Sequence, residues 1–579
     1  MSRQCKEILS GDDISRQANG GFTTEPLILT TASAKKIVAY LDLPNSSESP
    51  LGTVLIAPAY GETKENNLLI SAYLAANRFC GLRFDWSDHV GESEGDICTS
   101  TLTKMRQVLV SLLDYAQLRF SEQPVGIFAS SLAARVAIKV TAQDRRPAFL
   151  VCLTPVVDLR ETLTMVYKED LAGNYSAGKR YGTIDILGLT INADNFLEDA
   201  ITNSFVDLMS TKRDARSIAI PSYFVVGERD TWVRIEDAKS VVECLSSATK
   251  TIVVLSTMLH RLLESPTIAV SAIKEIVRNL IECTDRRKAN PHSIQIPDSN
   301  QISFRKSHER NQLRERYEYS QAEERGFWKA YLSKFRYVFN IPDFYALLES
   351  IHNRLGGVWA GQKVLDIGCG VGNFGLFLLT KQLYRAQQDL QYAKLEPLLY
   401  YGVDFVWEAI SAASRQISEL RTDFMSRIGL ASSNGSFLKE QFVLADLEVG
   451  IPFPNEFFNN ACCNLVISYL QDPATMLKEL WRVLRPGGRV VISSLKPNAD
   501  LSEIYRNFIS FTDDRLEIEE GRQLLNNAGL IKVKEAAGIY HFYSEKELRD
   551  VVRKAGFHRA KTFRSFGNQA NLVVGYKGY

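Results

Sequence analysis

Short apolar runs rich in β-branched residues alternate with helical patterns along two long stretches of the chain. In the first stretch, residues 26–283, the runs that predict strands are 37–41, 53–57, 81–84, 149–153, 222–226 and 251–255. Helical patterns such as that of residues 67–77 separate these runs. This alternation is typical of a mostly parallel sheet covered by helices, so we predict an α/β fold.

The periodicity fades after residue 283 and resumes about thirty residues later. Turn and charge clusters at 285–288 and 297–300 predict a linker in which basic residues predominate. A solvated connector is one interpretation of this segment, and a docking site for the acidic face of a carrier protein is the other. We therefore predict two domains, 1–283 and 313–579, joined by a linker at 284–312.

Composition and charge narrow the class of protein. The chain has 579 residues, 45% of them hydrophobic and 23% charged, with a formal net charge of +1. This balance argues against nucleic-acid binding driven by overall charge. The first residues lack the apolar core of a secretory signal, and no apolar stretch is long enough to cross a bilayer. The nine cysteines are scattered without a CxxC pair, which favours reduced thiols in the cytoplasm over disulfides or a metal site.

Residues 124–135 predict a strand, a sharp turn and a helix, with a serine on the turn. Such a turn lifts the serine hydroxyl above the sheet and admits only small residues two places before and after the nucleophile. For Ser131 those neighbours are Ala129 and Ala133, whereas Ser130 has bulky neighbours at the same distances. Ser131 is therefore the candidate nucleophile. The structural alternative is a buried serine that opens a helix.

Two further residues follow later strands in the order that a serine hydrolase on such a sheet requires. Asp230 comes after the run 222–226, and His260 comes after the last strand. An imidazole must take the proton of the serine hydroxyl, and a carboxylate must hold the imidazole in the right tautomer. His89 precedes Ser131, so chain order selects His260 as the base. The alternative is that Asp230 caps a helix and His260 lies on a surface loop.

Three segments of this half carry a resemblance to a known family: the run 127–137, the loop 84–93 and the segment 227–233. Together they resemble the acyl transferases of bacterial luminescence, which are thioesterase-like α/β-hydrolases that take a fatty acyl group from a carrier. The resemblance departs at Ala133, where the family leads us to expect a second small polar residue.

This resemblance implies an acyl thioester on acyl carrier protein or coenzyme A as substrate. It assigns Ser131 as nucleophile, Asp230 as the orienting acid and His260 as the general base. The backbone N–H groups of Tyr60 and Leu132 would form the oxyanion hole.

The segment of about 155–220 intervenes between two predicted core strands and carries apolar residues from Ile184 to Leu189, with Ile191 and Phe196 beyond them. We interpret it as a lid over an apolar acyl pocket. The alternative is ordinary core packing, because burying helix faces needs no ligand.

The second half contains a buried strand, a glycine-rich turn and a helix within residues 363–375. Glycines let the backbone approach a nucleotide-like ligand that faces the helix N-terminus, although a dinucleotide fold could use the same turn. The downstream segments 401–404, 444–454 and 480–492 decide between these two interpretations of the turn. With them, the turn resembles that of class I S-adenosylmethionine-dependent methyltransferases, which implies a second, Rossmann-like domain and S-adenosyl-L-methionine as cofactor.

The resemblance assigns the cofactor contacts residue by residue. The methionine part would be lined by Asp366, Gly368, Gly370 and Gly372, the ribose would bind Asp404, the adenine would lie beside Asp446 and Leu447, and the methyl group would face Ser468 and Tyr469. Residues 380–397 form a longer insert before Asp404 than the family leads us to expect. The late aromatics Tyr540, His541 and Tyr543 either position the methyl acceptor or pack in the core.

We therefore predict a bifunctional cytoplasmic enzyme without a membrane span. A serine acyl transferase or thioesterase would act on a carrier-bound acyl chain, and a methyltransferase would modify the released carboxylate or a related small molecule. The alternative is a methyltransferase whose first half is a non-catalytic module that binds the acyl chain or its carrier. A third possibility is that the second half binds the methyl donor without transferring its methyl group.

Overall fold

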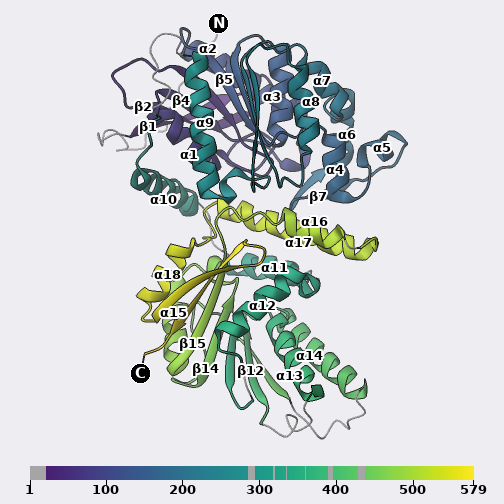
Figure 1. The fold of residues 1–579 in the computed structure, drawn as a ribbon, viewed down its shortest axis with the longest axis vertical. Coiled ribbons are helices and arrows are strands. Elements are labelled where there is room, and N and C mark those ends of the chain that lie inside the picture. The colour runs from purple at the N-terminus through teal and green to yellow at the C-terminus, as the bar shows by residue number, and fades with distance from the viewer. Residues whose placement is uncertain are drawn as a thin grey trace. The chain divides into compact units, whose positions relative to one another are not determined.

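The computed structural model describes residues 21–284, 294–316, 320–333, 335–358, 360–388, 396–427, 437–510 and 512–578. It divides into two compact units. The first comprises Met1–Arg316 with Leu525–Gly538, and the second comprises Tyr317–Leu524 with Ile539–Tyr579. Each unit holds its own sheet with helices on both faces, so the predicted two-domain α/β class is confirmed (Figure 1).

The sheet of the first unit has eight strands in the order β1-β2-β4-β3-β5-β6-β9-β10. The strands are β1 (Phe22–Thr30), β2 (Lys36–Pro44), β3 (Gly52–Ala57), β4 (Phe79–Phe84), β5 (Val125–Ser130), β6 (Pro147–Leu153), β9 (Ser222–Gly227) and β10 (Lys250–Leu255). From β4 to β10 the strands are parallel, while β1 and β2 are antiparallel to their neighbours. The carboxyl ends of β5, β9 and β10 therefore share one edge.

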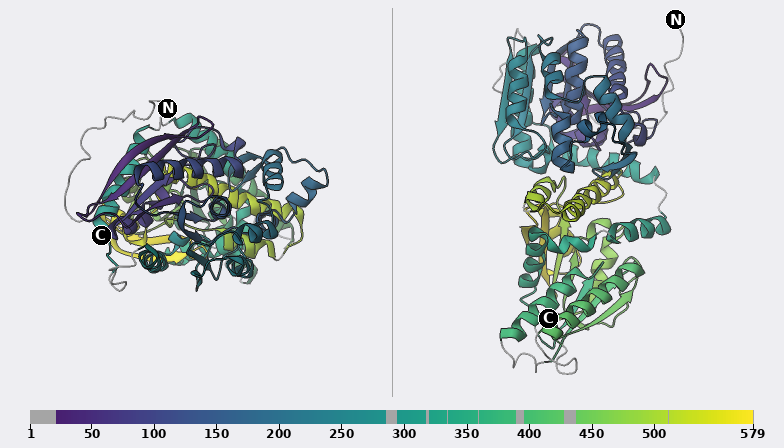
Figure 2. Two further views of the ribbon diagram at one scale, coloured as in Figure 1. Left: turned by 90° about the horizontal axis from the view of Figure 1, so that it is seen from above. Right: turned by 90° about the vertical axis from the view of Figure 1, so that its right-hand side faces the viewer.

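Helices cover both faces of this sheet, as the turned views also show (Figure 2). They include α1 (Leu68–Ala76), α2 (Leu102–Arg119), α3 (Leu132–Gln143), α8 (Ile235–Cys244) and α9 (Pro266–Thr284). Helices α1 and α9 pack together and bury their apolar faces against β3, β5, β6 and β9. This burial fixes the sheet on which the first candidate site stands.

The segment between β6 and β9 folds into short elements: α4 (Leu159–Tyr167), α5 (Leu171–Ser176), β7 (Thr183–Ile186), β8 (Leu189–Asn192), α6 (Ala193–Thr202) and α7 (Leu208–Ala215). Each of the four helices begins after a side chain that accepts a backbone N–H of its first turn, and these caps are Asp158, Asp170, Asn192 and Asp207. Such caps fix where a short helix starts. Strands β7 and β8 form an antiparallel hairpin.

The sheet of the second unit has seven strands in the order β13-β12-β11-β14-β15-β17-β16. The strands are β11 (Lys363–Ile367), β12 (Leu398–Asp404), β13 (Leu438–Leu444), β14 (Phe458–Asn464), β15 (Leu484–Leu495), β16 (His558–Ser565) and β17 (Ala570–Tyr576). Strand order reverses between β11 and β14. In open α/β sheets, ligands bind beyond the carboxyl ends of the strands at such a point.

The helices of the second unit are α11 (Gln321–Ser333), α12 (Pro342–Arg354), α13 (Asn373–Gln388), α14 (Trp407–Arg427), α15 (Pro473–Val483), α16 (Ser502–Ser510) and α18 (Glu545–Lys554). Helices α15 and α18 share one buried apolar cluster with β11, β14, β15 and β17. Helices α13 and α14 pack against each other, and α13 also packs against α12. Part of the long insert predicted after residue 380 lies outside the described residues.

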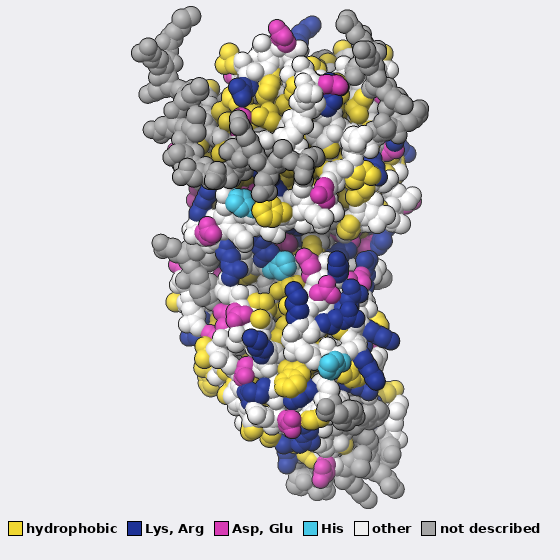
Figure 3. All heavy atoms as spheres, turned by 90° about the vertical axis from the view of Figure 1, so that its left-hand side faces the viewer, with side chains coloured by type: hydrophobic (Ala, Val, Ile, Leu, Met, Phe, Trp, Pro, Cys, Tyr) yellow, Lys and Arg dark blue, Asp and Glu magenta, His cyan; other side chains and the backbone are white. Residues whose placement is uncertain are grey.

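Both charge signs are interspersed with apolar side chains on the face shown in Figure 3. This distribution fits the formal net charge of +1. Within the described ranges, no helix is long and apolar enough to cross a membrane.

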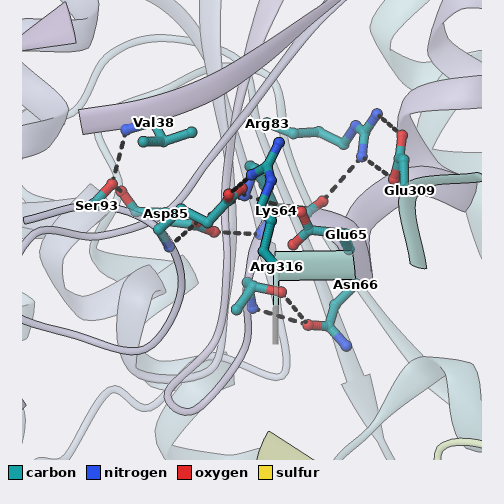
Figure 4. Close-up of polar contacts among 11 residues, drawn as sticks. Val38, Lys64, Glu65, Asn66, Arg83, Asp85, Ser93, Glu309 and Arg316 are labelled. Carbon is teal, nitrogen blue, oxygen red and sulfur yellow. Dashed lines mark hydrogen bonds and ion pairs between the residues drawn. The ribbon is translucent and has the colours of Figure 1, made fainter. Parts of the chain in front are cut away.

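The predicted linker is wrong over residues 299–312, because they belong to helix α10 (Ser299–Arg316) of the first unit. The helix is polar in sequence, but its Glu309 is only 5% exposed. Its carboxylate accepts two hydrogen bonds from the guanidinium of Arg83, at 3.0 and 3.2 Å (Figure 4). Arg83 is itself fully buried and also pairs with Asp42. The basic cluster at 285–288 lies outside the described residues.

The predicted extent of the second domain, 313–579, also differs from the structure, because residues 313–316 and one internal segment group with the first unit. Helix α17 (Arg515–Ala536) begins in the second unit, but residues 525–538 group with the first. The contacts that place them there are non-local, so periodicity along the sequence could not reveal them.

Candidate functional site

Ser131 stands on a sharp turn between β5 and α3. Its backbone has φ 53° and ψ −123°, a conformation that a residue with a side chain rarely adopts. The turn is held by the N–H of Ser131, which donates to the carbonyl of Leu153 at 2.9 Å. Ala129 and Ala133, the small neighbours predicted from the sequence, are both fully buried. Strain of this kind persists only where surrounding structure fixes it, and it clusters at functional sites.

The structure brings together the three side chains that the sequence singled out in the first half. His260 Nε2 lies 2.8 Å from Ser131 Oγ, and His260 Nδ1 lies 2.8 Å from Asp230 Oδ2. Asp230 is further fixed because its Oδ1 accepts the N–H groups of Trp232 and Val233, at 2.8 and 3.1 Å. The Asp230 side chain is fully buried and that of His260 is 10% exposed. This geometry can move a proton from the hydroxyl to the imidazole.

The two residues predicted to supply the oxyanion hole lie on different elements, one after β3 and one at the start of α3. Leu132 is the first residue of α3, and N–H groups of a first helical turn have no partner within the helix. Tyr60 follows β3, and its ring meets the edge of the His89 ring at a centroid distance of 5.2 Å. The N–H of the next residue, Gly61, donates to His89 Nε2 at 3.5 Å.

His89 is a residue whose role sequence reasoning missed. It lies on the loop 85–93, where the Asp85 carboxylate accepts the N–H groups of Lys64 and Glu92 at 2.7 and 2.9 Å. Lys64 Nζ also donates to Asp85 at 2.8 Å (Figure 4). Burial lowers the pKa of His89 to about 4, so the ring is neutral at pH 7 and its Nε2 can accept from Gly61. The position of this histidine in the loop was visible in the sequence, but its contact with residue 61 was not.

The buried His89 gives a prediction on acid stability. Its pKa is depressed in the folded state, so it contributes stability that is present above pH 6.5 and lost as the pH falls toward 4. A shift of this size corresponds to about 3 kcal/mol. In a His89→Gln variant that loss is absent. We therefore compare the free energy of unfolding of the wild type with that of the variant. The wild-type value minus the variant value should be about 3 kcal/mol lower at pH 4 than at pH 7.

Hydrogen exchange at the β5 amides, corrected for intrinsic rates, measures this difference in the full-length chain. Burial raises the pKa of Asp85 to about 6 against the attraction of Lys64, and this shift changes stability in the opposite direction over the same range. Asp85 is present in both proteins and cancels. A difference that stays constant with pH would contradict the neutral, buried state of His89.

The second candidate site lies where β11 ends in the glycine-rich turn. Gly368, Gly370 and Gly372 have φ values of 64°, 52° and 80°, in the left-handed region that favours glycine. A Cβ on Gly368 would lie 2.4 Å from a methyl carbon of Val466, which follows β14. The turn therefore sits at the reversal between β11 and β14, and its close backbone approach depends on glycine.

Asp404, at the end of β12, holds this turn in place. Its Oδ2 accepts the N–H of Gly370 at 2.9 Å, and its Oδ1 accepts the N–H of Val406 at 3.0 Å. The residue is 5% exposed, and burial raises its pKa although both backbone hydrogen bonds act to lower it. The structure therefore brings Asp404 to the glycine turn.

The other predicted cofactor residues have different surroundings. Asp366 points between strands, where its carboxylate accepts from Tyr400 Oη at 2.7 Å and Cys462 Sγ at 3.3 Å. Burial raises its pKa to about 6, and the charge of Asp404 adds to the rise. The Ser468 hydroxyl is 2.7 Å from that of Ser494 and is buried, so it is engaged within the core.

At the adenine edge, the predicted pair Asp446 and Leu447 follows β13. Asp446 accepts hydrogen bonds from the Gln321 side chain and from the N–H of Glu448, the latter at 3.0 Å. Leu447 belongs to the buried apolar cluster of the second unit. The pair is thus positioned by α11 on one side and by the core on the other.

Helix α11 brings residues to this site that sequence reasoning missed. A Cβ on Gly370 would lie 3.2 Å from Leu332, so the helix lies against the glycine turn. One turn earlier, Trp328 contacts Tyr469 and Tyr540 at centroid distances of 4.6 and 6.1 Å. The Tyr540 hydroxyl donates to the buried carboxylate of Glu324 at 2.8 Å. The aromatic residues of α11 were a visible signal, but their partners lie more than one hundred residues away.

Comparisons with known proteins match the two halves separately. Residues 27–310 match the acyl transferase family, and residues 339–560 match a methyltransferase domain family. An acyl transferase of Photobacterium phosphoreum is 26% identical over 203 residues, which are 35% of this chain and 66% of that protein. One from Photobacterium leiognathi is 27% identical over 228 residues, 39% of this chain and 74% of that protein. The match thus spans just under two thirds of the first relative.

Among solved structures, Est1E of Butyrivibrio proteoclasticus with bound ferulic acid is 18% identical. It covers 44% of this chain and 99% of its own, with a TM-score of 0.38.

Proposed function

We propose that this chain, which joins an acyl transferase domain to a methyltransferase domain, takes an acyl group from a thioester onto Ser131 and methylates a small-molecule acceptor. The observation that carries the proposal is the continuous hydrogen-bonded chain from Ser131 Oγ through His260 to Asp230, at 2.8 Å for each link. We propose acyl carrier protein or coenzyme A as the thiol part of the donor.

In the proposed acyl transfer, Ser131 Oγ attacks the thioester carbonyl and its proton passes to His260 Nε2. Asp230 stabilises the imidazolium that forms, and the N–H groups of Tyr60 and Leu132 receive the charge on the carbonyl oxygen. The C–S bond then breaks, and the leaving thiolate takes the proton from His260. The product is an acyl ester of Ser131, which water or another acceptor resolves. We propose that residues 155–220 cover the acyl chain.

In the second half, the residues present fit S-adenosyl-L-methionine. Three glycines with positive φ give the turn a conformation that glycine favours, and a side chain on Gly368 or Gly372 would meet protein atoms at 2.4 and 2.7 Å. When bound, this cofactor supplies a methyl group on a positively charged sulfur. We propose that Asp404 fixes the turn that holds it, with Asp446 and Leu447 beside the adenine and Asp366 and Ser468 supporting the turn from the core.

We also propose a released carboxylate as the methyl acceptor and the cytoplasm as the compartment in which the protein works. If the acyl ester is resolved by water, the released carboxylate is a nucleophile that needs no general base, and its methylation gives a methyl ester. The cysteines that the structure describes are all free thiols, which supports a reducing cytoplasm.

A fluorophosphonate probe tests the acyl half. The full-length protein should be labelled, because Ser131 Oγ displaces fluoride from phosphorus while His260 takes the proton. Ser131→Ala should abolish labelling, and the matched Ser130→Ala variant, one residue earlier, should retain it. Absence of labelling in wild type, or its retention in Ser131→Ala, would favour the alternative that the first half only binds acyl chains or their carrier.

A further inference from the structure

We propose that residues 525–538, which lie within the methyltransferase stretch of the sequence, complete the acyl site by holding the β7–β8 hairpin over the loop that carries Tyr60. We call these residues the clamp segment. They belong to the first unit together with the hairpin and the three residues of the proposed acyl site. The inference rests on the proposed acyl transfer at Ser131 for its functional part, and on packing alone for its structural part.

Two glycines allow the clamp segment and the hairpin to meet backbone to backbone. A Cβ on Gly529, inside α17, would lie 1.6 Å from the carbonyl oxygen of Leu187. A Cβ on Gly188 would lie 2.2 Å from the carbonyl oxygen of Asn526. The N–H of Gly188 also donates to Asn526 Oδ1 at 3.3 Å. Any side chain at position 188 or 529 would push the two segments apart.

The local conformations agree with this contact. Leu187 and Gly188, which connect β7 and β8, have φ values of 49° and 81°, and the first is unfavourable for leucine. Such strain persists where neighbouring structure fixes it, and here the Leu187 carbonyl lies against the helix. Gly529 lies in the interior of α17, where glycine costs about 1 kcal/mol relative to alanine. The close packing of the hairpin against α17 explains both the positive φ of Leu187 and the presence of glycine within the helix.

The end of the clamp segment packs against helix α10 of the first unit. A Cβ on Gly538 would lie 2.6 Å from the carbonyl oxygen of Arg310 in α10. Burial raises the pKa of Glu535, although the positive charges of Lys532, Lys306, Arg310 and Arg261 act to lower it. Arg261 directly follows His260 and pairs with Glu62 at 3.4 Å. The segment therefore reaches both the hairpin and the loop after β10.

The hairpin also lies against the loop after β3. Leu189 is 3.4 Å from where a Cβ of Gly61 would lie, next to the proposed oxyanion donor at Tyr60. Farther along the hairpin, the carbonyl of Asp185 accepts from the Tyr167 hydroxyl at 2.6 Å. The hairpin is thus packed between the clamp segment and the oxyanion loop. Displacing it would expose this loop to water and loosen the donor that must face the reacting carbonyl.

The test compares two alanine substitutions at helical glycines of the full-length chain. Gly529→Ala forces the clamp segment away from Leu187, whereas Gly326→Ala, in α11, adds a Cβ with nothing within 4 Å. The rate of Ser131 acylation by an acyl-coenzyme A should fall about 10²-fold in Gly529→Ala, because small displacements at a site have effects of this size. It should stay within about twofold in Gly326→Ala.

Hydrogen exchange at residues 183–192 gives a readout that does not depend on acylation. It should accelerate in Gly529→Ala and not in Gly326→Ala. If Gly529→Ala fails to fold, Asn526→Ala, which removes only the side-chain acceptor for Gly188, should give a smaller change in the same direction. Unchanged exchange of the hairpin in the folded variants would overturn the clamp. If the wild-type protein is never acylated but Gly529→Ala still accelerates exchange of the hairpin, only the proposed acyl transfer is refuted and the clamp stands.

Discussion

Replacing His260 by glutamine is expected to slow acylation of Ser131 by about 10⁶-fold, the effect seen when a serine hydrolase loses its base. Glutamine can hydrogen-bond to the serine hydroxyl, but it cannot accept the proton, so the oxygen remains a poor nucleophile. Asp230 would remain in place because its Oδ1 is bonded to two backbone N–H groups. Thiol release from an acyl-coenzyme A, measured before the steady state, gives the rate.

His558→Gln is the matched control for this prediction, since His558 is exposed on β16 of the second unit. Its acylation rate should stay within about twofold of wild type. If His260→Gln retained more than a tenth of the wild-type rate, His260 would not be the base. The three-residue assignment would then have to be abandoned.

Asp404→Asn is expected to weaken binding of S-adenosyl-L-methionine by about 10- to 100-fold, the range for losing a hydrogen bond to a charged group. The carboxylate accepts N–H groups from Gly370 and Val406, one on each oxygen. An asparagine amide has one acceptor oxygen, so one of these N–H groups would face an NH₂ donor. The glycine turn would then lose one of the hydrogen bonds that hold its conformation. Isothermal titration calorimetry measures the affinity.

Asp472→Asn controls for the general cost of this substitution. Asp472 also accepts two backbone N–H groups, from Ala474 and Thr475 at 3.1 and 3.2 Å, but it does so at the start of α15. Both N–H groups go to one oxygen, which asparagine retains, and asparagine caps helices about as well as aspartate, so this variant should keep its affinity for the methyl donor and lose little stability. Equal affinities in Asp404→Asn and wild type would remove Asp404 from the proposed cofactor site.

The pattern of apolar and small residues along the chain was enough to predict most strands of the first unit's sheet and the loops that carry its candidate residues. The apolar run before Ser131 became β5, and the small residues on either side of the turn identified the serine whose backbone is strained. Strands 222–226 and 251–255 were predicted within one residue, so the loops that carry Asp230 and His260 followed from chain order. Parallel strands bring such loops to one edge whatever the sequence between them.

The features that sequence reasoning missed depend on partners far along the chain. The polar sequence of helix α10 predicts a linker, because the partner of its one buried carboxylate, Glu309, is Arg83, more than two hundred residues earlier. Gly529 gave no sign that it contacts residue 187. Ser468 follows β14 as predicted, but its hydroxyl pairs with Ser494 because the neighbouring strand supplies a buried partner.

The central claim is that Ser131 carries the acyl group, and peptide mass spectrometry of the acylated protein tests it most directly. The full-length chain is mixed with a long-chain acyl-coenzyme A, quenched in acid and digested. The account predicts an added acyl mass on the peptide that contains Ser131, and no such mass in the Ser131→Ala variant. An acyl group found on another residue, or none at all over several chain lengths, would contradict it.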